Sequence, residues 1–111
     1  MDWKYLFTSY EGRINRAQFW AGVGVMIAIS IVVNIIDVMV GTEGILGLIV
    51  GLAMLYFALA VYAKRWHDRD KSGWWSLIML VPVIGFVWFL VECGILPGTQ
   101  GANRFGPDPL A

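Results

Sequence analysis

Three long stretches of this chain carry no formal charge, and they restrict its fold more than any other feature of the sequence. They cover residues 17–36, 44–63 and 72–91, which is 20 residues each. Because an α-helix rises about 1.5 Å per residue, each stretch can cross the roughly 30 Å hydrocarbon core of a bilayer. A crossing segment must also satisfy its own backbone hydrogen bonds, which a helix does. The sequence therefore predicts an all-α, polytopic membrane protein with three transmembrane helices.

The composition excludes several other classes of protein. Of the 111 residues, 59% are hydrophobic and 14% are charged, which is too few charges to cover a water-soluble domain of this size. Eight basic and eight acidic residues give no net positive charge for binding nucleic acid. Cys93 is the single cysteine, so a disulfide scaffold is excluded. With no linker or internal repeat visible, residues 1–111 are predicted to form one membrane domain.

The third uncharged stretch contains Pro82 and Gly85, so its helix is predicted to be kinked or broken between them. A kinked helix would cross the membrane once and leave the polar, glycine- and proline-rich tail, residues 97–111, outside the cell. A turn would instead produce two half-helices, residues 74–81 and 86–96, and return the tail to the cytoplasm. Non-helical backbone inside a bilayer needs protein or water to satisfy it. The kinked crossing is therefore the favoured interpretation, and the side that carries the tail stays open.

Basic residues lie on one side of the predicted spans. The turn between the first two spans, residues 37–43, has acidic residues and no base. Seven of the eight bases lie in the N-terminal segment or in the 64–71 loop: Lys4, Arg13, Arg16, Lys64, Arg65, Arg69 and Lys71. Because lysine and arginine are retained in the cytoplasm, both segments are predicted to be cytoplasmic. Most of the tryptophans fall at the same membrane interface, which agrees with this orientation.

Local signals predict how the helices begin and pack. Asn15 and Gln18 have the spacing of a capping box before the first span, and Ser72 is placed to cap the third. The second span carries a face of small residues that lets helices approach closely in lipid: Gly44, Gly47 and Gly51. The partner of this face is predicted to be the first span, a second copy of the chain or another membrane protein. Residues 2–10 have the pattern of a short amphipathic helix, which would lie along the membrane or at the fringe of the bundle.

Five polar residues are predicted to meet at the cytoplasmic interface: Arg13, Arg16, Arg65, His67 and Asp68. An arginine in a low-dielectric interface gains most from a carboxylate partner. We therefore expect Arg13 or Arg16 to hydrogen-bond a carboxylate, and the nearest ones are Asp68 and Asp70. Two interpretations stay open. The arginines are either structural anchors among the lipid headgroups, or parts of a binding site for an anionic lipid.

The adjacent His67 and Asp68 form the most chemically suggestive pair in the chain, because a histidine beside a carboxylate can act as a base, a pH sensor or a metal ligand. Zinc needs three or four ligands, and the sequence offers one histidine and a distant cysteine. The pair is therefore predicted to form a charge-paired structural loop, with no catalytic residue, metal or cofactor. Asp37 and Glu92 are interpreted as markers of the outer interface, and Cys93 as a buried, unreactive thiol.

Three ordered motifs extend from Gly12 to Pro109. They are Gly12-Arg13-x-x-Arg16-x-x-Phe19-Trp20, Arg65-x-His67-Asp68 followed by Ser72-Gly73-Trp74-Trp75, and Pro97-Gly98-x-x-Gly101-x-Asn103-x-Phe105-Gly106-x-x-Pro109. In this order and at these spacings they resemble the YhaH-like family of small bacterial inner-membrane proteins, a domain of unknown function. Trp66 and Phe105 depart mildly from the family pattern, which usually has leucine and often tyrosine there. The resemblance implies a multi-pass inner-membrane protein with no established activity, and it supplies no catalytic residues.

The function predicted from these features is that of a non-enzymatic membrane module of the cell envelope, which binds membrane lipids or a protein partner. No nucleophile and base, phosphate-binding glycine loop or ligand cluster is visible in the sequence. The alternative is a small oligomeric transporter or channel component. An enzyme that acts on a lipid through His67 and Asp68 is the least favoured interpretation.

Overall fold

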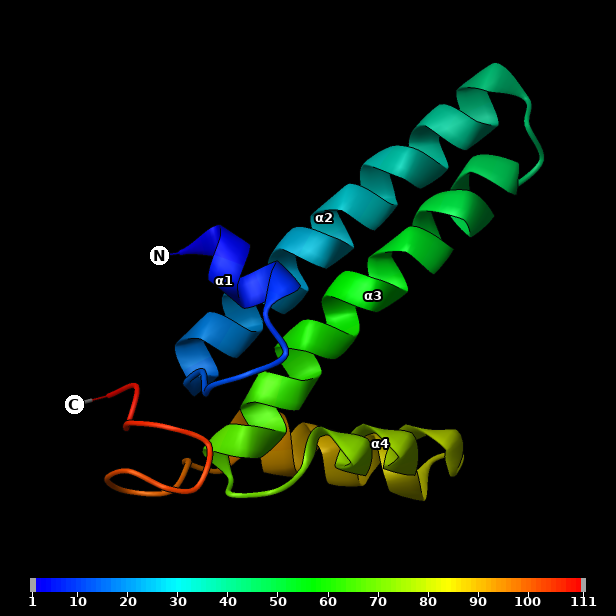
Figure 1. The fold of residues 1–111 in the computed structure, drawn as a ribbon. Helices are drawn as coiled ribbons and strands as arrows, with labels where there is room; N and C mark the ends of the chain where they lie inside the picture. The colour runs from blue at the N-terminus through cyan, green and yellow to red at the C-terminus, as the bar shows by residue number, and fades with distance from the viewer. Residues whose placement is uncertain (1, 111) are drawn as a thin grey trace.

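The computed structural model describes residues 2–110, and in this range the chain is helical, without strands. The elements follow one another as α1 (Trp3–Thr8), α2 (Arg16–Val40), α3 (Ile45–Asp68), the 3₁₀ helix η1 (Gly73–Leu80), α4 (Ile84–Phe89) and the π-helical turn η2 (Leu90–Ile95). Two long helices, α2 and α3, form an antiparallel pair, and the short elements gather at one end of it (Figure 1). The predicted all-α class is confirmed.

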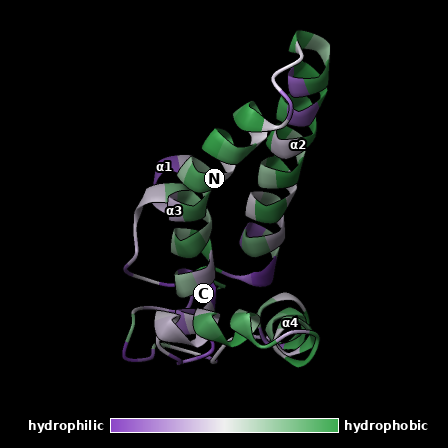
Figure 2. Ribbon diagram, turned by 90° about the vertical axis from the view of Figure 1, so that its right-hand side faces the viewer, coloured by the Kyte–Doolittle hydropathy of each residue, from purple (hydrophilic) through white to green (hydrophobic). Residues whose placement is uncertain are grey.

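The two long helices are the elements that can cross a membrane, by length and by composition. Helix α2 begins at the predicted capping box: the Asn15 side chain accepts from the Gln18 backbone N–H at 2.8 Å, and the Gln18 side chain accepts from the Asn15 N–H at 3.0 Å. It ends at Gly41, whose left-handed φ of 77° favours glycine. Hydrophobic residues cover most of α2 and α3 (Figure 2), as expected for helices that face lipid.

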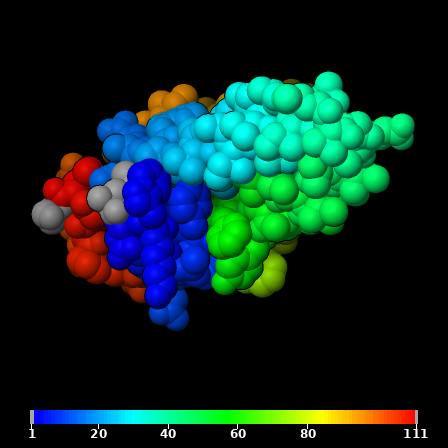
Figure 3. All heavy atoms as spheres, turned by 90° about the horizontal axis from the view of Figure 1, so that it is seen from above, coloured from blue at the N-terminus to red at the C-terminus, as the bar shows by residue number. Residues whose placement is uncertain are grey.

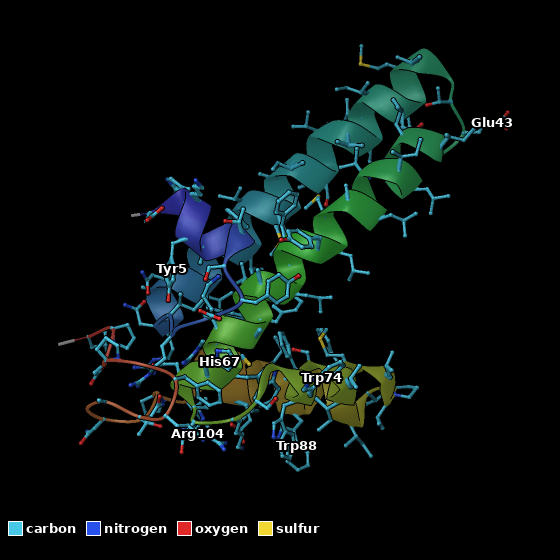
Figure 4. The ribbon with its side chains drawn as sticks, in the orientation of Figure 1. Tyr5, Glu43, His67, Trp74, Trp88 and Arg104 are labelled. Atoms are coloured by element: carbon cyan, nitrogen blue, oxygen red, sulfur yellow. The ribbon has the colours of Figure 1, made fainter. Side chains whose placement is uncertain are left out.

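The turn between α2 and α3 is organised by Asp37. Its carboxylate accepts hydrogen bonds from the Thr42 hydroxyl and from the Gly47 backbone N–H, the latter at 3.0 Å. Asp37 is thereby buried at the end of an apolar helix with its charge compensated by local donors. Glu43 lies at the tip of the turn, at the end of the molecule opposite to His67 and Arg104 (Figure 4).

The third uncharged stretch is a helical hairpin in place of the favoured single kinked helix, so three membrane-crossing helices are not confirmed. Its two arms are η1 and the α4–η2 segment, and the break covers residues 81–83, which overlaps the start of the predicted Pro82–Gly85. The hairpin lies across the lower end of α3 (Figure 1). A Cβ on Gly85 would lie 1.7 Å from the Ile78 carbonyl oxygen, so only glycine allows the arms to approach this closely.

The backbone N–H groups at the break donate to carbonyls of neighbouring residues, which is the physical reason that a turn is tolerated here. The Val81 N–H donates to the Ile78 carbonyl at 3.0 Å, and the Gly85 N–H donates to the Val81 carbonyl at 3.0 Å. The Ile84 N–H donates to the Pro82 carbonyl at 2.7 Å. These local bonds satisfy most of the groups that an interrupted helix would expose to lipid.

Residues 2–10 belong to the fringe of the bundle. Helix α1 packs on α3, and its Leu6 is buried in the core. The core lies at the same end of the helix pair as the hairpin and consists of Leu6, Ile14, Phe19, Val61, Trp66, Phe89 and Cys93. The side chains that were expected to lie along the membrane are thus partly used for packing within the chain.

The glycines of α3 do not form one continuous seam with α2. Gly47 approaches α2 closely, because a Cβ there would lie 3.1 Å from the Asn34 side-chain oxygen. Gly44 instead precedes α3 in a left-handed conformation, with a φ of 91°. A Cβ on Gly51 would have no neighbour within 4 Å among the described residues. A partner of this surface, a second copy or another protein, stays a prediction.

Candidate functional site

Charged side chains converge where the lower end of α3 meets the N-terminal segment and the C-terminal tail. Figure 3 shows the N-terminal segment in blue and the tail in red at the same end of the molecule. His67 and Arg104 mark this region in Figure 4. Three segments far apart in the sequence meet here: residues 9–16, the 64–71 region and residues 97–106.

Asp68 stands at the centre of this region and is almost completely buried. One carboxylate oxygen lies 2.9 Å from Nη2 of Arg13, and the other pairs with Nη1 of Arg65. Both guanidinium groups are buried as well. We call these three residues, Arg13, Arg65 and Asp68, the Asp68 cluster. Ion pairs out of contact with water need further hydrogen bonds for their remaining donors, and both arginines make such bonds to backbone carbonyls.

Arg13 connects the cluster to the tail. Its Nη1 donates to the carbonyl oxygens of Gly101 at 2.7 Å and Gly106 at 3.2 Å, and its Nη2 donates to the Thr99 carbonyl at 2.6 Å. The Thr99 N–H in turn donates to the Asp68 carbonyl at 2.6 Å. The polar tail, whose side stays open in the sequence analysis, therefore lies at the end of the molecule that carries Arg13.

Arg65 connects the cluster to the hairpin. Its Nε donates to the Cys93 carbonyl at 2.5 Å, and its Nη2 donates to the Leu96 carbonyl at 2.5 Å. Both carbonyls belong to the last turn of the hairpin. Burial raises the pKa of the Cys93 thiol to about 12, so this thiol stays protonated and unreactive at neutral pH.

His67 and Asp68 are not a side-chain pair, contrary to the expected charge-paired loop. The Nδ1 atom of His67 lies 2.9 Å from the Gly12 carbonyl oxygen, and its ring stacks on Phe105 with a centroid separation of 4.0 Å. The Asn103 side chain donates to the His67 carbonyl at 2.9 Å. Consecutive helical residues point in different directions, so the two side chains have different partners.

Arg16 also lies outside the Asp68 cluster. Its Nη1 donates to the Ile95 carbonyl at 2.7 Å, while Trp20, one turn further along α2, donates from Nε1 to the Gly94 carbonyl at 2.8 Å. These two bonds join the start of α2 to the end of the hairpin. Of the five residues predicted to meet, the structure brings Arg13, Arg65 and Asp68 into direct contact and places Arg16 and His67 beside them.

Sequence reasoning missed Lys64, which holds α1 in place. Its ammonium group is fully buried and donates to three backbone carbonyls, of Tyr5 at 2.7 Å, of Leu6 at 2.8 Å and of Ser9. Nothing in the sequence distinguishes Lys64 from the other bases that follow the second span. A lysine at a helix end normally extends its ammonium group outward to the lipid headgroups, whereas Lys64 directs it inward to backbone carbonyls of the N-terminal segment.

Glu92 was interpreted as a marker of the outer interface, and this is wrong. It lies beside the 64–71 region, where its carboxylate accepts from Nε of Arg69 at 2.9 Å and from Nζ of Lys71 at 2.6 Å. Burial alone would raise the pKa of Glu92, but the hydrogen bonds from Lys71 and Arg69 outweigh it and hold the pKa below the ordinary value. The folded hairpin brings Glu92 to these bases, which a single crossing helix would have kept apart.

The arrangement as a whole is a closed network. The guanidinium groups of the Asp68 cluster are bonded to a carboxylate and to backbone carbonyls. In residues 2–110 there is no group of three side chains that could hold a metal ion. What these contacts do is tie the N-terminal segment, the end of α3, the hairpin and the tail into one unit.

Residues 7–107 match the family described as "Protein of unknown function (DUF805)". The chain is 39% identical to the inner membrane protein YhaH of Escherichia coli (strain K12), over 98% of this chain and 97% of that protein. It is 34% identical to the inner membrane protein YhaI of the same strain, over 93% and 87% of the two chains. No solved structure matches the chain.

Proposed function

The chain belongs to the DUF805 family of proteins of unknown function, and its relatives YhaH and YhaI are named inner membrane proteins. We propose that it is a non-enzymatic module that binds lipid in that membrane. The proposal concerns the apolar outer surface of the molecule. The buried Asp68 cluster has a supporting role in it.

The observation that carries the proposal is the apolar outer surface of the hairpin. Trp74 and Leu80 are each 78% exposed, and Val83 is 75% exposed. The hairpin has no formal charge between residues 73 and 91, and Trp74 and Trp88 both extend from it in Figure 4. Exposed apolar surface in water costs about 25 cal/mol per Å². A hairpin of this composition is expected to lie against lipid, with its tryptophans near the interface.

The Asp68 cluster supports this surface by fixing the hairpin to α3. Arg65 bonds the end of the hairpin, and Arg13 bonds the tail that follows it. Because these guanidinium groups already have protein acceptors, the cluster is better suited to a structural role than to binding an anionic lipid. The exposed side chains of α2 and α3 are mainly apolar, which favours lipid contact over the lining of an aqueous transport path.

A topology follows from the same features. We place the N-terminus in the cytoplasm, because the basic residues gather at that end, and the turn at Glu43 in the periplasm. Helices α2 and α3 then cross the membrane. The hairpin lies in the cytoplasmic half of the bilayer and returns the tail to the cytoplasm. Two crossings, in place of the three expected from the charge pattern, are thus part of the proposal.

Cysteine labelling tests the topology. In a Cys93→Ala background, Glu43→Cys is expected to react with a membrane-impermeant maleimide added to intact spheroplasts. Ala102→Cys is expected to react only after the membrane is permeabilised, because its side chain lies on the cytoplasmic tail. If Ala102→Cys reacts in intact spheroplasts while Glu43→Cys also does, the hairpin crosses the membrane and the two-crossing topology is wrong.

Lipid retention tests the proposed function. We expect the protein, purified in a mild detergent, to carry about one tightly held lipid molecule per chain that survives exchange into a second detergent. Native mass spectrometry measures it, and a two-helix membrane protein of similar size, purified in parallel, gives the background. If the chain remains helical by circular dichroism but carries no more lipid than this background, it is not a lipid-binding module.

A further inference from the structure

A long apolar groove runs between the two crossing helices and the hairpin. It has a volume of about 760 Å³ and is lined by residues of α2, α3 and η1, among them Met26, Gly51, Leu55 and Met79. The groove lies along the part of α2 and α3 that faces the hydrocarbon core. A groove of this kind in a membrane is occupied by an acyl chain in preference to water, because its wall has few polar partners to offer.

A second cavity continues the groove toward the cytoplasmic end. It has a volume of about 390 Å³, and three residues line both spaces: Leu59, Ser76 and Leu77. Its wall differs in chemistry from that of the groove, because Tyr10, His67 and Ser72 contribute hydrogen-bonding groups. Together the two spaces have the form of a site for an amphiphile, apolar over most of its length and polar at one end.

Two polar atoms at this end are available for a ligand. The Ser76 hydroxyl oxygen is buried and has no hydrogen-bond partner among residues 2–110. An unpaired buried hydroxyl is destabilising, and a polar group of a ligand can supply the missing hydrogen bond. In His67 the Nδ1 atom faces the Gly12 carbonyl, an acceptor, so Nδ1 carries the proton and Nε2 is left as an acceptor. The Nε2 atom lies on the side of Gly73, another residue of the cavity wall.

The charge of this wall indicates which kind of head group fits. No lysine, arginine, aspartate or glutamate lines the cavity. The nearby cations are already bonded within the chain: Lys64 to three carbonyls, and Lys71 to Glu92. A phosphate or carboxylate would therefore enter without a counter-charge, which is costly away from water. A hydroxyl both donates and accepts, and so matches Nε2 of His67 and the Ser76 hydroxyl together.

We propose that the groove and the cavity bind one lipid of the acylglycerol class, with its acyl chain in the groove and its uncharged, hydroxyl-bearing glycerol head at Ser76 and His67. The inference rests on the proposed lipid-binding function and adds the place and the class of the ligand. It concerns a neutral lipid, whereas Arg13 and Arg65, two of the three arginines that the sequence offered for an anionic lipid, are bonded inside the protein.

Gly51 gives a sharp test, because it lines the groove and a Cβ added there has open space around it. A Cβ on Gly51 would meet nothing within 4 Å, and Gly51 lines the groove. Gly24 on α2 is a matched control: it is also helical and has open space around it, but it does not line the groove. Both Gly51→Leu and Gly24→Leu are expected to fold, since leucine is the better helix former.

The experiment compares two probes with the same acyl chain, mono-oleoylglycerol and oleate, on the delipidated protein in detergent. We expect mono-oleoylglycerol to bind with a stoichiometry of one, and oleate to bind at least about tenfold more weakly because its head is charged. Gly51→Leu is expected to weaken mono-oleoylglycerol binding by about tenfold or more, and Gly24→Leu to leave it unchanged. Ser76→Ala, which removes the hydroxyl, is expected to weaken it by about two- to tenfold.

Two results would overturn the inference while the proposed function stands. One is that Gly51→Leu binds mono-oleoylglycerol as the unchanged protein does. The other is that the protein retains phospholipid or binds oleate equally well, so that a neutral head is not selected. If the unchanged protein retains no lipid and binds neither probe while remaining helical, the proposed function and this inference both fail.

Discussion

Replacing Asp68 by asparagine is expected to lower the free energy of unfolding by about 3–5 kcal/mol, the usual cost of removing one partner from a buried ion pair. The asparagine keeps the size of the side chain and removes its charge. The guanidinium groups of Arg13 and Arg65 would then remain buried without a counter-charge. Thermal unfolding in detergent, followed by circular dichroism, measures the loss.

Asp70→Asn is the matched control for this substitution. Asp70 also pairs with an arginine, Arg104 at 3.2 Å, but both side chains are exposed. An exposed ion pair contributes at most about 1 kcal/mol. A loss of stability for Asp68→Asn no larger than that for Asp70→Asn would mean that the Asp68 cluster does not hold the fold together.

Replacing Gly98 by alanine is expected to detach the tail. A Cβ at this position would lie 2.0 Å from one carboxylate oxygen of Asp68 and 2.6 Å from the other, far inside van der Waals contact. The tail must then move, and Arg13 loses the carbonyl of Thr99 as an acceptor. Overpacking of this kind costs about 1–3 kcal/mol before the lost hydrogen bonds are counted.

Limited trypsin digestion and thermal unfolding report the effect of Gly98→Ala. We expect cleavage after Arg104 to become much faster while α2 and α3 stay helical. Gly24→Ala is the control, since a Cβ there meets nothing within 4 Å. If the tail of Gly98→Ala resists trypsin as well as that of Gly24→Ala, Gly98 is not seated on the Asp68 carboxylate.

The sequence predicts most accurately those features of the fold that depend on one helix alone. The uncharged stretches located α2 and α3, and the capping box at Asn15 located the start of α2. The resemblance to the YhaH-like family is confirmed by the family match over residues 7–107. These features depend on hydrogen bonds and apolar contacts within one segment or on an ordered series of motifs, so a linear pattern records them.

The path of the third stretch could not be read from its composition. An uncharged run of 20 residues indicates that the segment prefers lipid, but it is compatible with either one crossing helix or two short arms. Contacts between uncharged residues, such as the close approach of Gly85 to the Ile78 carbonyl, determine that the segment folds into two arms. A pattern of charged and uncharged positions does not distinguish such residues. Glu92 was misplaced for the same reason, because its partners Arg69 and Lys71 become neighbours only after the chain turns.

At the candidate site, spacing along the helix was a better guide than adjacency. Arg65 and Asp68 are three residues apart in α3 and pair, whereas the adjacent His67 and Asp68 face different partners. Positions three or four apart share a helix face, and consecutive positions do not. The burial of Lys64 depends on the backbone carbonyls of α1, which no side-chain pattern reveals.

The contacts between Arg13 and the tail impose an order on the biogenesis of the protein. Arg13 lies 86 residues before its acceptor Thr99 and 93 residues before Gly106. At roughly 5–20 residues per second, a ribosome needs several seconds to produce these acceptors after it has added Arg13. During that interval α2 and α3 are synthesised, and the guanidinium group is without its backbone acceptors. Lipid phosphates are the anions available at the membrane surface in the meantime. Arrival of the tail then supplies the backbone acceptors that Arg13 lacked.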